Sequence, residues 1–114
     1  MSDKELYSGM IRLHTLYHAS KGPIFGLWII EELGQHGYKR SPGTLYPILH
    51  ALERKGYLRS AQKREGRQAR RLYRTTPAER KALAAAKTKV RELIGELFED
   101  WRAVRKEIIL LIYY

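Results

Sequence analysis

The sequence contains no cysteine among its 114 residues, which excludes disulfide bonds and thiol chemistry. Long apolar runs are also missing, because the longest one, residues 108–114, is too short to span a bilayer. The N-terminus places Asp3, Lys4 and Glu5 before any apolar stretch, which is not the pattern of a signal peptide. We therefore expect a cytoplasmic protein with one domain and an appended arm.

Signatures of catalysis are absent as well. The chain has no nucleophile elbow, no glycine-rich phosphate loop and no pair of carboxylates framed by a motif. His14 and His18 stand four residues apart, a spacing at which two helical side chains can share a metal, but neither cysteine nor a carboxylate cluster accompanies them. The sequence therefore predicts no enzyme, no cofactor and no metal site.

Positive charge, in contrast, is abundant. The 22 Lys and Arg residues outnumber the 12 Asp and Glu residues, so that the net charge is +10. This balance indicates a polyanionic partner, either nucleic acid or an anionic membrane surface. A membrane-surface helix needs one basic face and one apolar face, whereas the C-terminal helix predicted below carries mixed charges beside its apolar seam. Nucleic acid is therefore the expected partner.

Residues 41–56 predict a helix with a defined start and end. Ser41 suits the N-cap, where its hydroxyl would accept a bond from a free backbone N–H, and Pro42 suits the first helical position. Gly56 is a natural helix stop. An apolar stripe with helical spacing is formed by Leu45, Ile48, Leu49 and Leu52.

The opposite side of this helix differs from an ordinary solvated face. It carries Gly43, Pro47, His50 and Arg54, flanked by Thr44 and Tyr46, which are mostly small, neutral or hydrogen-bonding residues suited to close approach to a groove. Pro47 lies inside the helix, where its ring should clash with the carbonyl of Gly43. Either the first turns adjust around this pair, or the helix begins later, near Leu45.

A basic hairpin follows at once. Residues 58–63 and 70–75 are compatible with strands, and Gly66 in the intervening residues 64–67 suits a positive-φ turn. Between residues 59 and 74 there is one acid, Glu65, against seven cations, namely Arg59, Lys63, Arg64, Arg67, Arg70, Arg71 and Arg74. Seven minus one is +6, more than half of the net charge. An alternative is an edge strand that uses charge to block aggregation, but arginine forks match phosphate geometry.

The preceding segments complete a recognisable order. Residues 23–35 predict a short helix that is apolar nearly all round and therefore central to the core. Residues 3–19 predict a first helix with two apolar faces, suited to its own core and to a partner. The expected fold is mainly α with a small β-hairpin (α+β), a winged helix-turn-helix followed by a long C-terminal dimerisation helix.

The residues at this helix and hairpin resemble a known family. Gly43-Thr44-Leu45-Tyr46-Pro47, followed by Leu49, Leu52, Glu53 and Gly56, resembles the signature of PadR-like transcriptional regulators, and Leu72-Tyr73-Arg74-Thr75-Thr76 resembles their second wing strand. The match covers about residues 6–80. The run from Thr76 to Arg80 lacks a glycine that the family often has after the wing. The resemblance implies a dimeric bacterial repressor that binds operator DNA and is released by a small effector.

The C-terminal segment predicts the dimer contact. Thr76 and Glu79 form a capping box with Pro77 at the first position, and apolar residues then recur every seven residues to the end of the chain. A helix of that length is longer than one small domain can cover, so a second copy is the simplest partner. We expect a DNA-binding domain at residues 1–76 and a dimerisation helix at residues 77–114. The predicted dimer contacts are Leu6, Met10, Leu83, Val90, Ile94, Leu97, Trp101, Val104, Ile108 and Leu111.

Two further sets of residues follow from this interpretation. The predicted contacts to double-stranded DNA, arranged on a palindromic operator, are Lys39, Arg40, Ser41, Thr44, Tyr46, Pro47, His50, Arg54, Lys63, Arg64, Arg67, Arg70 and Arg71. In PadR-like proteins an effector can lodge near the long helices, so Tyr7, Met10 and Trp101 are candidate contacts to a small hydrophobic or aromatic molecule. The alternative function is a winged-helix module that binds RNA or protein without operator specificity.

Overall fold

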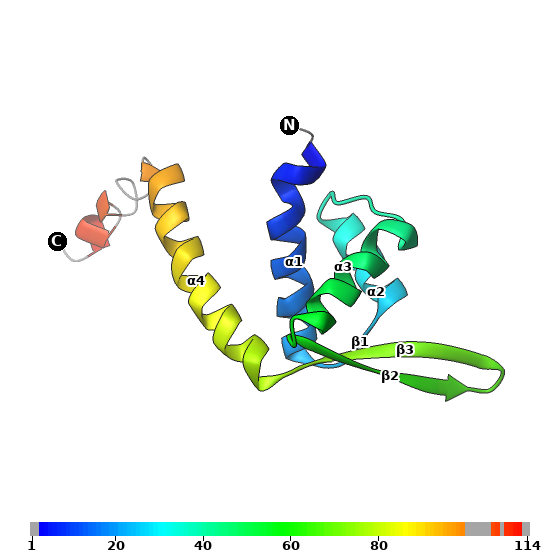
Figure 1. Ribbon diagram of the computed structural model, residues 1–114. Helices are drawn as coiled ribbons and strands as arrows, with labels where there is room; N and C mark the ends of the chain where they lie inside the picture. Colours follow the sequence, from blue (N-terminus) through cyan, green and yellow to red (C-terminus); the bar gives the residue numbers. More distant parts are fainter. Residues whose placement is uncertain (1–2, 100–105, 108, 113–114) are drawn as a thin grey trace. The chain divides into compact units, whose positions relative to one another are not determined.

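The computed structural model describes residues 3–99, 106–107 and 109–112 (Figure 1). It divides into two units, Met1–Leu83 and Ala84–Tyr114, and the first unit contains a three-helix core with a small sheet. The elements of this unit are α1 (Asp3–Lys21), β1 (Ile24–Phe25), α2 (Gly26–Gln35), α3 (Pro42–Arg54), β2 (Leu58–Glu65) and β3 (Gln68–Thr75). Helix α4 (Pro77–Leu97) begins in the first unit and continues into the second.

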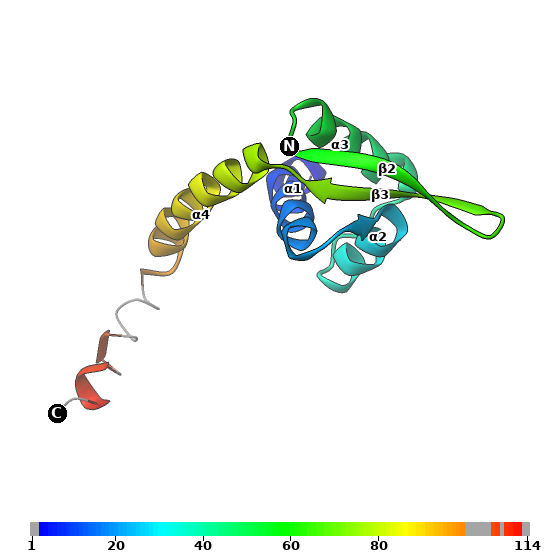
Figure 2. The same ribbon diagram turned by 90° about the horizontal axis from the view of Figure 1, so that it is seen from below.

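The core lies where the first three helices meet the sheet (Figures 1 and 2). Its fully buried residues come from every element of the first unit: Ile11 and Leu16 from α1, Ile29 and Leu33 from α2, and Tyr73 from β3 are examples. From α3 the core takes Leu45, Leu49 and Leu52, while Ile48 is half-buried. The apolar stripe predicted for this helix is therefore the face that it buries.

The sheet has three antiparallel strands in the order β1-β3-β2. Its first strand corrects the prediction of a helix beginning at Pro23, because Ile24 pairs with Tyr73 and Phe25 pairs with Leu72. A β-branched and an aromatic residue suit a strand, and the partner that supplies their ladder hydrogen bonds lies almost fifty residues further along the chain. Local periodicity could not reveal this pairing.

Helix α2 also differs from the prediction of a helix buried on all sides. Ile29 and Leu33 are fully buried, but Leu27 is 60% exposed and Trp28 is 43% exposed. A helix in a small three-helix layer packs along one stripe, and the rest of its surface faces solvent. The helix ends in a Schellman motif around Gly37, which has φ of +87°. There Tyr38 N–H donates to the Leu33 carbonyl at 2.9 Å and Gly37 N–H donates to the Gly34 carbonyl at 3.1 Å.

Helix α3 begins at Pro42, so the alternative start near Leu45 is wrong. Ser41 is extended and occupies the N-cap, but its hydroxyl makes no capping bond to a backbone N–H and lies instead 3.4 Å from the Thr44 hydroxyl. Its carbonyl accepts the first helical bond, from Leu45 N–H at 3.0 Å. The predicted stop is confirmed, since Gly56 has φ of +83° and closes a second Schellman motif.

Helix α4 begins as predicted. Glu79 N–H donates to the Thr76 hydroxyl at 3.3 Å, and Thr76 in turn donates to the Gly56 carbonyl. Helix α4 ends at Leu97, and residues 106–107 and 109–112 are also helical, while residues 100–105 lie outside the described residues, so that one continuous helix to the end of the chain stays a prediction. Gly95 has low helix propensity and lies two residues before this end. Trp101, Val104 and Ile108 lie outside the described residues.

Candidate nucleic-acid interface

The outer face of α3 is formed by Gly43, Pro47, His50 and Arg54, and all four residues are exposed. Pro47 lies inside α3, which continues through it from Pro42 to Arg54. Thr44 is half-buried beside this face. The face therefore offers a narrow, nearly uncharged ridge with one imidazole and one guanidinium, which suits insertion into a groove lined by base edges.

Tyr46 occupies a different position from the one expected for a residue that reads bases. It is half-buried and packs against the core. A Cβ atom added to Gly26, at the start of α2, would lie 2.6 Å from the Tyr46 hydroxyl and 2.8 Å from its Cζ atom. The tyrosine ring thus lies directly against the glycine backbone and joins α3 to α2. The contact of Tyr46 with DNA stays a prediction.

The wing, residues 58–75, is the basic hairpin. Its strands are two residues longer at the tip than predicted, and they close through Gly66 and Arg67 with Glu65 paired to Gln68. Gly66 has φ of +63° at the first turn position, as a type II′ hairpin requires. Beyond Ser60 and before Leu72 every residue is exposed, and the tip extends past the helices in both views (Figures 1 and 2).

The strand register gathers positive charge on one face of the wing. Arg59 is directly opposite Arg74, and Lys63 is directly opposite Arg70. These four exposed side chains lie on the face opposite to the buried Tyr73, because strand residues alternate between faces. Like charges placed opposite one another destabilise a hairpin by roughly 0.2–1 kcal/mol per pair. Opposed pairs of cations that lower stability in the free protein are typical of a surface that binds an anion.

Arg71 is hydrogen-bonded to α3 through Ser60. Its Nη1 donates to the Ser60 hydroxyl at 2.8 Å, and that hydroxyl lies 2.7 and 2.9 Å from the two carboxylate oxygens of Glu53. This chain of bonds connects β3, β2 and α3. Arg71 therefore fixes the wing relative to α3, and a contact with DNA stays a prediction for it.

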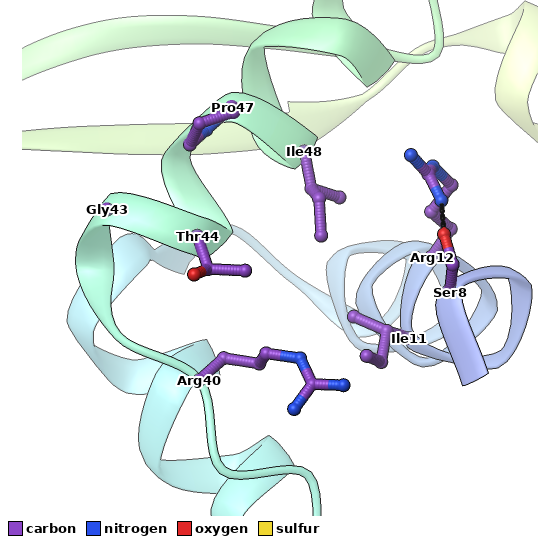
Figure 3. Close-up of a pocket in the computed structure, with 8 residues that line it drawn as sticks. All are labelled: Ser8, Ile11, Arg12, Arg40, Gly43, Thr44, Pro47 and Ile48. Atoms are coloured by element: carbon purple, nitrogen blue, oxygen red, sulfur yellow. Dashed lines mark hydrogen bonds between the residues drawn. The ribbon is translucent and has the colours of Figure 1, made fainter. Parts of the chain in front are cut away.

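Arg40 is turned toward the protein interior. Its Nη1 donates to the Lys39 carbonyl at 2.9 Å, and its Nε is buried with no hydrogen-bond partner among the described residues. Figure 3 shows the side chain directed from the turn toward α1. It lines a cavity of about 270 Å³, together with Ser8, Ile11, Arg12, Gly43, Thr44, Pro47 and Ile48. Lys39, in contrast, is exposed.

Two of the three candidate effector residues, Tyr7 and Met10, both contact Tyr38 in the turn between α2 and α3. The Tyr7 ring lies 5.9 Å from the Tyr38 ring in an edge-to-face arrangement, and the Tyr38 hydroxyl lies 3.8 Å from Met10 Sδ. Neither Tyr7 nor Met10 lines the cavity beside Arg40. Trp101, the third candidate, lies outside the described residues.

Many of the predicted dimer contacts are uncovered apolar side chains. In the first unit Leu6 is 59% exposed and Met10 is 48% exposed, while Leu83 is half-buried. In the second unit Val90 is half-buried, but the exposed residues are Ile94, Leu97 and Leu111, joined by Leu93 and Phe98, which the heptad spacing did not single out. Each unit therefore presents apolar surface that the chain itself leaves in solvent.

Comparison with known proteins decides the family. The model of the transcriptional regulator PadR-like family matches residues 15–85. The chain belongs to this family. It is also 46% identical over 94 residues to the transcriptional regulator Rv3488 of Mycobacterium tuberculosis. The aligned region covers 82% of this chain and 88% of that protein. The PadR-like chain is thus a DNA-binding transcriptional regulator and not an enzyme.

Solved structures agree with this membership. A PadR family regulator from Eggerthella lenta has a TM-score of 0.72 and 30% identity, and the match covers 83% of this chain and 87% of that one. A PadR-like transcription factor from Bacteroides fragilis shares the fold, with a TM-score of 0.73 over 83% of this chain and 93% of that one, at 22% identity. Among the described residues of this PadR-like regulator, none of the helices is apolar over a stretch long enough to cross a bilayer.

Proposed function

We propose that this PadR-like regulator is a dimeric repressor that binds a palindromic operator and is released by a small hydrophobic or aromatic effector. The observation that carries the proposal is the exposed outer face of α3 beside a wing whose sixteen residues 59–74 have a net charge of +6. Operator recognition needs one surface that contacts base edges and one that contacts phosphates, and the outer face of α3 and the wing suit these two tasks.

The residues divide between these two tasks. Thr44, Pro47 and His50 would meet base edges in the major groove, where Pro47 would contact thymine methyl groups. Phosphate contacts would come from Lys39, Arg54 and the wing cations Lys63, Arg64, Arg67 and Arg70. Ser41, Arg40, Tyr46 and Arg71 remain candidates, although three of them, Arg40, Tyr46 and Arg71, have contacts inside the protein.

The dimer would form through the exposed apolar residues of α1 and of the C-terminal unit. We keep the division into a DNA-binding domain at residues 1–76 and a dimerisation helix at 77–114 as part of the proposal. Two copies would present two α3 helices to two half-sites about one turn of DNA apart, so that binding energy accumulates over both halves.

Binding to the regulator's own promoter fragment tests the proposal. Fluorescence anisotropy should show tight binding to that duplex with a steep loss of affinity as salt rises, and at least a thousandfold weaker binding to a random duplex of equal length. Sedimentation of the same sample should give a dimer. Equal affinity for random duplexes, or tighter binding to structured RNA, would favour the alternative winged-helix module without operator specificity.

The effector can be tested separately. Phenolic acids and planar hydrophobic drugs should quench tryptophan fluorescence and lower the affinity for the promoter fragment. Tyr7→Ala and Met10→Ala should weaken that quenching. If none of these molecules changes the fluorescence or the operator affinity, the effector part of the proposal fails while operator binding stands.

A further inference from the structure

Three of the four histidines of the chain lie together where α1 meets the end of α2. His14 and His18 come from α1, and His36 is the C-cap residue of α2. Their ring nitrogens offer one ligand atom each, and these atoms all lie within 4.8 Å of one another. The rings of His14 and His36 stack with their centroids 4.9 Å apart. The sequence pointed only to the pair on α1, because His36 is brought to it by the fold.

A carboxylate completes the group. Glu32 Oε1 lies 3.7 Å from His18 Nε2 and also 3.7 Å from His36 Nε2. Glu32 lies one helical turn before the C-cap residue His36, so the two side chains are on the same face at the end of α2. The group therefore has three imidazoles and one carboxylate, held by two helices that pack against each other.

This donor set selects a class of ion. Imidazole nitrogens with one carboxylate suit borderline divalent transition ions such as Zn²⁺, whereas Mg²⁺ and Ca²⁺ prefer sites made of oxygen ligands. Burial, followed by the neighbouring His36 and His18, lowers the pKa of His14, although Glu32 acts in the opposite direction.

The geometry lies within reach of coordination. Tetrahedral zinc with nitrogen ligands near 2 Å needs donor atoms about 3.3 Å apart, so the present separations must shorten by side-chain rotation. His36 is exposed and stacks on His14, so that a small rotation of its side chain does not disturb the core. The His18 ring also packs against Trp28 in an edge-to-face arrangement, with the ring centroids 5.4 Å apart.

We propose that His14, His18, His36 and Glu32 form a binding site for one divalent transition-metal ion of the zinc type. The bound ion joins α1 to the end of α2, at the residue where the chain enters the turn that leads to α3. Binding therefore stabilises the helix-turn-helix against unfolding, because the ion binds the folded arrangement and not the separated ligands.

Metal titration of the full-length, chelator-stripped protein tests this site. Zn²⁺ should bind one per chain in competition with a chromophoric indicator, and Co²⁺ should give visible absorption bands of the intensity typical of tetrahedral coordination. His36→Gln and Glu32→Gln should each weaken Zn²⁺ binding at least tenfold. Both residues are at least partly exposed, so these variants keep the fold, which circular dichroism checks without metal.

Two matched controls sharpen the result. His50→Gln removes the fourth histidine, which lies on α3 outside the group, and Glu31→Gln removes the exposed carboxylate next to Glu32. Neither should change the Zn²⁺ affinity, and Zn²⁺ should raise the melting temperature of both but not that of His36→Gln. The proposal is overturned if no saturable binding is found, or if the affinity survives His36→Gln unchanged.

Discussion

At the scale of single residues, Tyr46 shows how a motif residue can serve the fold. The sequence places Tyr46 beside the outer face of α3, yet its ring lies against Gly26 and its side chain packs against the core. The absence of a side chain at Gly26 is what allows this close approach. The pair therefore sets the separation between α2 and α3, on which the position of the outer face of α3 depends.

Gly26→Ala tests this contact. The new methyl group would lie 2.6 Å from the Tyr46 hydroxyl, so the ring must move, and we expect a loss of about 1–3 kcal/mol in the free energy of unfolding. Urea denaturation of Gly26→Ala, Tyr46→Ala and the double variant measures it. In the Tyr46→Ala background the alanine should cost much less, and an equal cost in both backgrounds would show that Tyr46 is not the obstacle.

Tyr73 offers a second test at this scale. It is fully buried, burial raises the pKa of its hydroxyl, and that hydroxyl has no hydrogen-bond partner among the described residues. Tyr73→Phe should therefore leave the free energy of unfolding unchanged or raise it by about 1 kcal/mol. Tyr73→Ala should lower it by about 3–5 kcal/mol, since the ring fills the core. A marked loss in Tyr73→Phe would reveal a bond to the hydroxyl.

At the scale of elements, hydrogen bonds join the base of the wing to α3. Glu53 and Ser60 hold Arg71 and the Arg70 guanidinium lies over the Phe25 ring, so the strands are anchored at their base, while residues 61–69 toward the tip are all exposed. The two opposed pairs, Arg59 with Arg74 and Lys63 with Arg70, cost stability unless an anion offsets them. The base of the wing therefore belongs to the fold, and its outer half is available for DNA.

Arg64→Gln separates these two roles. Arg64 is exposed near the tip, so its loss should weaken binding to every duplex alike and leave the melting temperature unchanged. The slope of log K against log salt should become less steep by about 0.9 for each chain engaged, and by about twice that for a dimer. Anisotropy at several salt concentrations measures this slope.

Glu65→Gln is the matched control for Arg64→Gln. Glu65 Oε1 lies 3.9 Å from Lys63 Nζ, and removing this carboxylate should strengthen binding slightly. A loss of affinity in Glu65→Gln, or a loss of sequence preference in Arg64→Gln, would contradict the assignment of the wing to phosphates.

At the scale of the whole molecule, two units each leave apolar side chains in solvent. Leu93, Ile94 and Leu97 on α4 are between 45% and 66% exposed, and they lie on one stripe with Val90. Apolar side chains that remain exposed to water do not stabilise a single copy of the chain. A second copy that covers the stripe would explain it, and that copy would also supply the second half-site contact.

Ile94→Glu should break the proposed dimer. A charge buried in an apolar interface is costly, so sedimentation should show single chains at concentrations where the wild type is dimeric, with weaker operator binding. Thr88→Glu adds the same charge at an exposed position on the opposite side of α4 and should leave both properties unchanged. A dimeric Ile94→Glu protein would place the interface elsewhere.

Much of this arrangement was predictable because it rests on local patterns. The apolar stripe of α3, its stop at Gly56 and the basic hairpin follow from spacing and turn residues that act within a few positions, whereas the start of α3 at Pro42 was left open between two alternatives. The strand at Ile24 and Phe25 did not follow, because its partner is distant in sequence. The inward turn of Arg40 and the packing of Tyr46 were missed for the same reason, since each depends on another helix.

The sequence by itself determined the charge, the order of the helices and the basic hairpin, because composition and short-range periodicity are properties of neighbouring residues, and its motifs carried the resemblance to the PadR-like family. Only the tertiary structure decided which cations keep free charge, how the wing is tied to α3, and that His36 and Glu32 meet the histidines of α1. Those contacts arise from packing between segments far apart in the chain, and no local pattern encodes them.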